Sequence, residues 1–208
     1  MLALGGTPFK RGAGRKRVYP PASGWRAHSG CLIRVFDLQQ TSLQMPVSRQ
    51  ELFDRLAELG IETRTLEHEA VFTVAESSEV ERQLPGAHTK NLFLKDESGA
   101  LFLVVAIATT RVDLKSLSRT LGAKRFSFGK PELLQEVLGV PPGSVTAFAV
   151  INDVSKQVAV VLDADLLKHE TINCHPLENT ATTNIAWGDL MRFIRSCGHE
   201  PRVVELAD

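Results

Sequence analysis

The stretch that decides the fold is His88-Thr89-Lys90-Asn91-Leu92-Phe93-Leu94-Lys95-Asp96, which is followed by the turn residues Glu97-Ser98-Gly99 and the apolar run Leu101–Ala108. Two largely apolar segments around a short polar turn with glycine are typical of a β-hairpin. The sequence therefore predicts paired strands over Lys90–Asp96 and Ala100–Ala108. Lys90 is the charged residue that opens the first strand.

Helix and strand signals continue on both sides of this hairpin. Ser48 and Glu51 form a capping box, which predicts a helix that ends at Gly60. Further helices are predicted over about 73–83, 113–122, 131–138 and 187–197, and strands over 61–67, 145–151, 157–163 and 202–206. The strands 145–151 and 157–163 are predicted to form a second hairpin. Hairpins interleaved with helices predict an α/β fold, a mixed and mostly antiparallel sheet with helices packed on it, in a single domain.

Composition and charge describe a globular protein with unevenly distributed charge. The chain has 208 residues, of which 43% are hydrophobic, and its 24 basic and 24 acidic residues balance. Residues 1–45 hold seven basic residues and one acid and carry +6, so residues 46–208 carry −6. An acidic body does not favour bulk nucleic-acid binding, but it leaves a local contact open. No apolar run approaches the roughly 20 residues that cross a bilayer. The three cysteines are too few and odd in number for a disulfide framework. The sequence therefore predicts a protein of the reducing cytoplasm.

Residues 1–45 differ in character from the remainder of the chain. Glycine and proline pairs alternate with basic residues without a sustained period, which predicts a disordered arm. Three other interpretations stay open: a transit peptide, a basic tail that binds nucleic acid, and a translation start at Met45, directly before the first capping box. We therefore place the domain boundary at Met45 and expect the folded domain over residues 46–208.

Two further blocks carry the functional signal. They are Gly143-Ser144-Val145-Thr146-Ala147-Phe148-Ala149-Val150-Ile151-Asn152-Asp153 and Asn173-Cys174-His175-Pro176-Leu177-Glu178-Asn179-Thr180-Ala181-Thr182-Thr183. With the His88–Asp96 block, they resemble in order and spacing the prolyl-tRNA-synthetase-associated editing domains of the ProX/YbaK type, over about residues 45–205. Within that family the chain looks closest to the free-standing deacylase that removes alanine from the tRNA for proline. The resemblance implies an editing-type domain and a hydrolase that acts in trans on mischarged tRNA.

The resemblance assigns catalysis to Lys90 and Gly143. A cation at a strand mouth can bind a phosphate or carbonyl oxygen as a point charge, although a surface lysine beside a strand is the plain interpretation. Glycine lets the backbone approach a ligand and direct N–H groups at an oxyanion. The segment Pro141-Pro142-Gly143 also fits an ordinary turn.

Substrate binding is expected from short polar side chains and one histidine. The resemblance assigns His175 to the amino acid pocket, with a weaker option as general base; Pro176 favours an extended backbone at His175. The other substrate-binding candidates are Asn91, Ser144, Asn179, Thr182 and Thr183. The alternatives are a strand-end cap for Asn91 and a structural role for His175. For Asn179, Thr182 and Thr183 the alternative is to cap the helix at Trp187.

Six basic residues within twenty positions form the candidate tRNA-binding surface. They are Arg111, Lys115, Arg119, Lys124, Arg125 and Lys130. Lys115 and Arg119 are four apart and share a helix face. A solvated helix face is the plain interpretation, and with a tRNA ligand the same face is the best candidate for contacts with acceptor-stem phosphates.

We expect no cofactor and no metal. The chain has neither a G-x-S-x-G elbow nor a Walker loop. Cys174-His175 and Cys197-x-His199 together contain four residues of the types that bind zinc. Neither spacing matches that of the usual structural zinc pairs. The partners implied by the resemblance are the acceptor end of mischarged tRNA for proline, with prolyl-tRNA synthetase or an elongation factor as further candidates and no membrane. The alternatives are removal of cysteine from the same tRNA and a non-catalytic module that binds tRNA or the synthetase.

Overall fold

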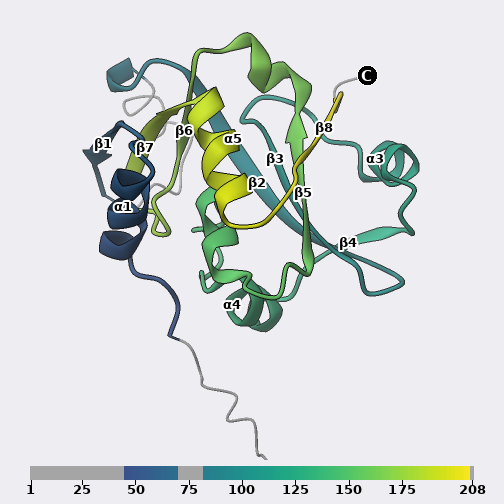
Figure 1. The fold of residues 1–208 in the computed structure, drawn as a ribbon. Helices are drawn as coiled ribbons and strands as arrows, with labels where there is room; N and C mark the ends of the chain where they lie inside the picture. The colour runs from purple at the N-terminus through teal and green to yellow at the C-terminus, as the bar shows by residue number, and fades with distance from the viewer. Residues whose placement is uncertain (1–44, 70–81, 207–208) are drawn as a thin grey trace, which may run out of the picture. The chain divides into compact units, whose positions relative to one another are not determined.

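The computed structural model describes residues 45–69 and 82–206, which belong to one unit that spans Leu43–Asp208 (Figure 1). The helix predicted over 73–83 and the arm predicted over 1–45 lie largely outside the described residues. The described helices are α1 (Arg49–Glu58), α3 (Leu114–Leu121), α4 (Pro131–Leu138) and α5 (Trp187–Ser196), with 3-10 helices η1 (Ala147–Asn152) and η2 (Ala164–Lys168). The described strands are β1 (Thr63–Glu67), β2 (Ala87–Asp96), β3 (Leu101–Ile107), β4 (Phe126–Phe128), β5 (Val158–Asp163), β6 (Thr171–Cys174), β7 (Ala181–Ala186) and β8 (Arg202–Val204).

The strands form one mixed sheet in the order β1-β7-β6-β2-β3-β5-β8, and β4 pairs with β2. Four of the described pairings are antiparallel, β1 with β7, β6 with β7, β2 with β3 and β2 with β4. Three are parallel, β2 with β6, β3 with β5 and β5 with β8. The prediction of a mixed, mostly antiparallel sheet with helices packed on it is therefore confirmed.

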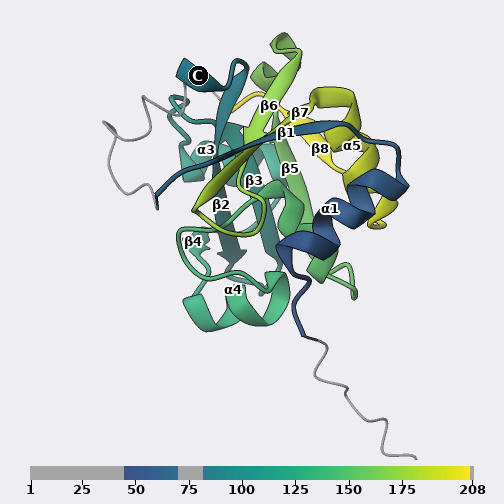
Figure 2. The same ribbon diagram turned by 90° about the vertical axis from the view of Figure 1, so that its left-hand side faces the viewer.

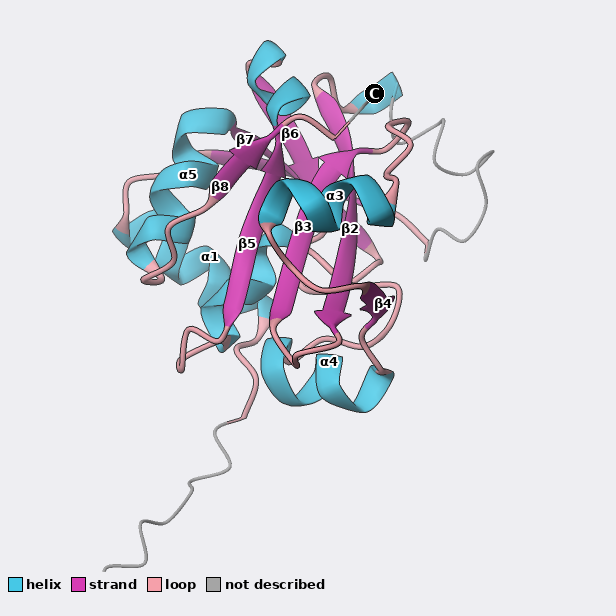
Figure 3. Ribbon diagram, turned by 90° about the vertical axis from the view of Figure 1, so that its right-hand side faces the viewer, coloured by secondary structure: helices cyan, strands magenta, loops and turns pink. Residues whose placement is uncertain are grey.

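Helices cover both faces of the sheet. On one face, α1, α4, α5 and η1 pack on Leu103 and Val105 of β3 and bury Phe148 and Phe193 edge to face, with ring centroids 5.4 Å apart. On the other face, α3 packs Leu117 and Leu121 against strands β2, β3 and β5 (Figure 3). The alternation of β3 residues between the two clusters explains why this strand is apolar throughout.

The predicted second hairpin is wrong. Val158–Asp163 is a strand, but it pairs in parallel with β3, and residues 147–152 form η1. The side chain of Thr146 accepts a hydrogen bond from Phe148 N, and Ala147 to Val150 are all buried. Four consecutive buried residues fit a helical turn against the core better than a strand that exposes every second side chain. The strands β4, β6 and β7 were not predicted.

Candidate active site

Strand β2 has one complete and one interrupted edge. Strand β3 pairs with it from Thr89 to Lys95. On the other edge, β6 pairs only with Ala87 and His88, and β4 pairs only with Leu94 to Asp96. Figure 2 shows β6 and β4 towards opposite ends of β2. The two ladders leave a gap in the sheet beside residues 89–93.

The main chain of Asn91 points into this gap. His88 O accepts from Ala108 N, and Asp96 N donates to Ala100 O, so the even-numbered residues of β2 direct their main-chain groups at β3. Phe93 O accepts from Gly129 N at 2.9 Å on the opposite edge. Because the main-chain direction alternates along a strand, the N–H and C=O of Asn91 face the same edge as those of Phe93.

A cavity of about 210 Å³ occupies this edge. It is lined by Asn91, Leu92, Phe93, Phe128, Gly129, Pro131, Leu134, Pro142, Gly143 and Val145. The side-chain oxygen Oδ1 of Asn91 is buried and has no hydrogen-bond partner among the described residues. Leaving a buried acceptor unpaired costs about 1–3 kcal/mol. A ligand that donates a hydrogen bond in this cavity would recover that free energy.

Gly143 lines the same cavity, and the side chain of Asn179 lies close to it. Gly143 has φ +90°, and a Cβ at this position would lie 3.7 Å from Asn179 Nδ2. The turn is closed by Ser144 N, which donates to Pro141 O at 3.1 Å, and Ser144 itself is buried. The structure therefore brings the predicted residues Asn91 and Gly143 to one cavity and places Asn179 beside Gly143, although the three are far apart in the sequence.

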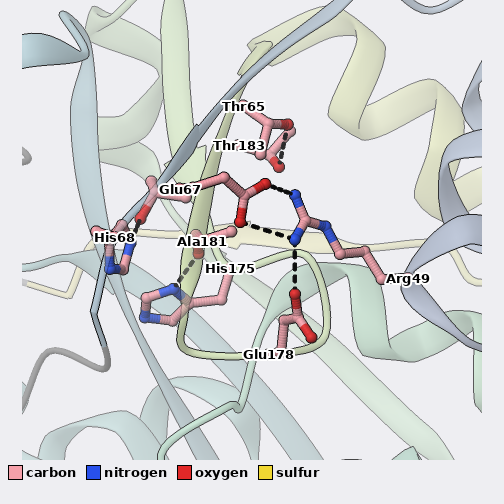
Figure 4. Close-up of polar contacts among 9 residues, drawn as sticks. Arg49, Thr65, Glu67, His68, His175, Glu178, Ala181 and Thr183 are labelled. Carbon is pink, nitrogen blue, oxygen red and sulfur yellow. Dashed lines mark hydrogen bonds and ion pairs between the residues drawn. The ribbon is translucent and has the colours of Figure 1, made fainter.

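The surroundings of His175 favour its neutral form and one tautomer. Its Nδ1 lies 2.9 Å from Ala181 O, and since a carbonyl oxygen can only accept, Nδ1 carries the hydrogen (Figure 4). Burial lowers the pKa of His175 below its ordinary value, and nearby His68 and His88 lower it further, while the contact with the Ala181 carbonyl opposes the shift. The other nitrogen, Nε2, therefore offers a lone pair near neutral pH.

The two predicted threonines point to opposite faces of β7. Thr182 Oγ1 lies 2.9 Å from Nε2 of His68, whose ring centroid is 6.3 Å from that of His175. Thr183 Oγ1 instead pairs with Thr65 Oγ1 at 2.9 Å. Adjacent strand residues point to opposite faces, so only Thr182 belongs to the histidine pair.

A charged bridge holds the loop that carries His175. Arg49 Nη1 donates to Glu178 Oε1 at 2.7 Å and to Glu67 Oε2 at 3.0 Å (Figure 4). Hydrogen bonds to Glu67 and to Glu178 raise the pKa of Arg49 above its ordinary value. In the same loop, Leu177 has φ +70°, which L-residues rarely adopt, and its side chain is buried in the core. Such a conformation persists only when the surroundings hold it in place.

Lys90 and Asn91 point to opposite faces of the sheet. Lys90 pairs with Ala106, which packs in the cluster under α3, whereas Asn91 pairs with Val105, which packs on the α1–α5 side. The ammonium of Lys90 donates to Thr110 O. Lys90 therefore does not line the cavity at Asn91, and it reaches the loop between β3 and α3.

All six predicted tRNA-binding residues are exposed. Lys115 and Arg125 line a hollow of about 470 Å³ between α3 and β4, together with Leu114, Ser118 and Phe126. Lys124 is also held by its main chain, because its N–H donates to Asp96 Oδ2 at 3.0 Å. Part of the basic run thus surrounds one concave surface.

Three further features of the described part of the chain bear on function. Among residues 45–69 and 82–206, no three His, Cys, Asp or Glu side chains are grouped so that they could hold a metal ion. Cys174 is fully buried, which raises its pKa to about 12. No described helix has the length and apolarity that crossing a membrane requires.

The site also contains residues that the sequence analysis did not predict. His68 and Arg49 contact partners more than 100 residues away, Thr182 and Glu178. Phe128 lines the cavity from β4, a strand of three residues. A short strand and contacts across the chain leave no periodic signal in the sequence.

Comparisons with known proteins show the family of the chain. Residues 68–193 match the aminoacyl-tRNA editing domain family. The chain is 41% identical over 158 residues to prolyl-tRNA synthetase associated domain-containing protein 1 of Danio rerio, covering 75% of this chain and 86% of that protein. It is 32% identical over 160 residues to the prolyl-tRNA editing protein ProX of Acetoanaerobium sticklandii, covering 76% of this chain and 98% of the relative.

A solved structure shares the fold at lower identity. It is a candidate trans-editing enzyme for prolyl tRNA synthetase, with a TM-score of 0.62 and 20% identity, and the match covers 78% of this chain and 99% of that one. The family match spans more than half of the chain and includes Asn91, Gly143 and His175. The chain belongs to the aminoacyl-tRNA editing domain family.

Proposed function

We propose that the chain is a trans-editing deacylase that hydrolyses the ester of mischarged tRNA, with alanine on the tRNA for proline as its substrate. Membership of the editing family supports this proposal, as does the similarity to a relative named as a prolyl-tRNA editing protein. The observation that carries it is the gap beside β2, where Asn91 lines a small cavity, directs its main chain into the gap and has an unpaired side-chain oxygen.

The cavity offers complementary groups for an aminoacyl ester. The α-ammonium of the substrate would donate to Asn91 Oδ1, which has no described partner. The ester carbonyl would lie near the main chain of Asn91 and Gly143, where an N–H can stabilise the charge that develops on the oxygen. Such an ester is already activated, so positioning and oxyanion stabilisation suffice without a protein nucleophile.

Water attack needs an acceptor near the ester. His175 is neutral, with Nδ1 donating to Ala181 O and Nε2 free of its hydrogen. In the proposed mechanism, His175 binds the aminoacyl group, and a role as general base is the weaker option. The 2′-hydroxyl of the terminal adenosine assists the water. Ser144, Asn179 and Thr182 would shape the substrate site around this centre, whereas Thr183 points to the opposite face of β7 and pairs with Thr65.

Lys90 has a separate role in the proposal. Its ammonium contacts Thr110 O, and a lysine has further N–H donors for a phosphate. We assign it to electrostatic binding of a substrate phosphate on the α3 side of the sheet, opposite to Asn91. The exposed residues from Arg111 to Lys130 would then contact acceptor-stem phosphates, and their positive charge offsets the acidic remainder of the domain. Prolyl-tRNA synthetase or an elongation factor would deliver the substrate in the cytoplasm.

The decisive experiment measures deacylation by the purified chain of four substrates: alanyl-, cysteinyl- and prolyl-tRNA for proline, and alanyl-tRNA for alanine. The proposal predicts fast release of alanine from the first and slow release from the other three. Fast release from cysteinyl-tRNA alone would establish the cysteine deacylase instead. Binding of tRNA without release of any amino acid would establish the non-catalytic module.

A further inference from the structure

Phe128 is an exposed aromatic residue at the rim of the candidate cavity. It is 65% exposed and nevertheless lines the cavity with Asn91 and Gly143. The other exposed large hydrophobic residues of the described chain, Met45, Val154, Leu167 and Val203, do not line that cavity. A phenyl ring that faces water beside a site with unpaired polar groups offers a flat apolar surface to a ligand.

The position of Phe128 is determined by short contacts between β4 and β2. Phe128 pairs with Leu94, and Gly129 N donates to Phe93 O at 2.9 Å. A Cβ on Gly129 would lie 2.3 Å from Phe93 Cδ1, so only glycine permits this close approach. Phe126, two residues earlier, packs edge to face on Phe102 in the core, with ring centroids 4.9 Å apart. Strand β4 is thereby anchored at one end, and Phe128 stays at the surface.

Positive charge surrounds this aromatic surface. Arg125 and Lys130 lie within three residues of Phe128 and are exposed. Aromatic rings flanked by basic side chains are the combination that binds single-stranded nucleic acid, because the ring stacks on a base and the cations attract phosphates.

We infer that Phe128 is the stacking platform for the terminal nucleoside of the RNA, while the adjacent cavity takes the aminoacyl group. This inference rests on the proposed function, and it names the part of the substrate that the cavity alone does not recognise. Stacking does not select strongly among bases, so the platform holds the end of the strand and leaves amino acid selection to the cavity.

The test is calorimetric binding of the uncharged trinucleotide CCA to the full chain and three variants. Phe128→Ala should weaken binding by roughly five- to a hundredfold, the range found for loss of one stacked base. Phe128→Trp should retain binding, because it restores a larger ring. Leu167→Ala is the control, since Leu167 is 52% exposed on η2. Melting curves of all variants should coincide.

Three results would overturn the inference: wild-type protein that does not bind CCA, Phe128→Ala that binds as wild type, or an equal loss in Leu167→Ala. Failure of the proposed function gives a different result, namely CCA binding that depends on Phe128 without deacylation of any aminoacyl-tRNA. The stacking site would then stand, as the site of a module that binds RNA ends.

Discussion

Arg49, at the first turn of α1, donates to the carboxylate of Glu178 at 2.7 Å and so ties this helix to the loop that carries His175 and Asn179. The same guanidinium contacts Glu67 at the end of β1, and it lies over the ring of Phe53 with 5.4 Å to the centroid. The loop contains Leu177 at φ +70°, and its position depends on such external contacts.

We expect Arg49→Ala to affect substrate binding more than stability. The Arg49 side chain is 27% exposed and that of Glu178 is 44% exposed, so the pair should contribute at most about 1 kcal/mol to the free energy of unfolding. Movement of the loop should raise KM for alanyl-tRNA roughly two- to fivefold, with kcat nearly unchanged. Steady-state kinetics and denaturant unfolding measure the two effects. Arg55→Ala is the matched control, because Arg55 pairs with Glu58 within α1; equal KM changes in both variants would contradict this prediction.

For Lys90→Ala, the phosphate-binding role predicts a rise of about tenfold in KM for alanyl-tRNA, the scale of one lost charge-assisted contact, whereas the catalytic role that the resemblance implies would lower the rate by about a hundredfold or more. Lys90→Arg should restore activity only in part, because the guanidinium is wider and planar. Single-turnover deacylation with a melting curve tests this. Lys95→Ala, an exposed lysine on the same strand, should behave as wild type. A stable Lys90→Ala protein with near-normal kinetics would mean that Lys90 only holds the loop at Thr110.

His175→Gln should raise KM about tenfold through loss of one hydrogen bond to the aminoacyl group. It should also change the pH dependence of stability. Burial lowers the folded-state pKa of His175 below 6.5, so the unfolded chain binds a proton first as pH falls. The stability that neutral His175 contributes is present above pH 6.5 and is lost as pH falls from 6.5 towards the lowered pKa. The free energy of unfolding, measured from about pH 7.5 to about pH 5, should therefore depend less on pH in His175→Gln than in wild type. The exposed His169→Gln is the control, and parallel curves for wild type and His175→Gln would refute the assignment.

Charge reversal at Lys115 and Arg119 should weaken tRNA binding and reduce the slope of log K against log salt by about two, one for each phosphate contact. Hydrolysis of alanyl-adenosine, which lacks the acceptor stem, should not change. Filter binding across a salt series measures the slope. Lys168→Glu serves as control, because Lys168 is 73% exposed in its side chain and lies outside the basic run. An unchanged slope would mean that this helix face is only solvated.

A chain that begins at Met45 should fold and deacylate like the full chain. It retains the contact of Val47 N with Asn152 Oδ1 at 2.8 Å and the Ser48–Glu51 capping box of α1. Residues 1–44 lie outside the similarity to the editing domains, so their removal should leave melting temperature and turnover within error. A large loss of either quantity would show that the arm belongs to the domain.

Features that depend on contacts within a few residues of sequence were predicted from the sequence. The Ser48–Glu51 capping box occurs as predicted, and α3 and α4 begin at the predicted positions, with Asp113 as the cap of one and Pro131 in the first turn of the other. Gly122 and Gly139 end α3 and α4 in left-handed conformations. These contacts are local, so the order of residues is sufficient to specify them. The hairpin of β2 and β3 was predicted for the same reason, because one tight turn joins its strands.

Tertiary structure decided what depends on distant partners. Residues 147–152 form η1 because packing against α5 overrides their strand propensity. Strand β5 pairs in parallel with β3, which lies more than 50 residues earlier in the sequence. Single residues follow the same division. The sequence by itself determined that Lys90 and Asn91 are neighbours, that Gly143 lies in a turn and that His175 precedes a proline. Only the fold decided that Asn91 faces a gap in the sheet with Gly143 while Lys90 faces the opposite side, because strand pairing, and not sequence proximity, directs each side chain.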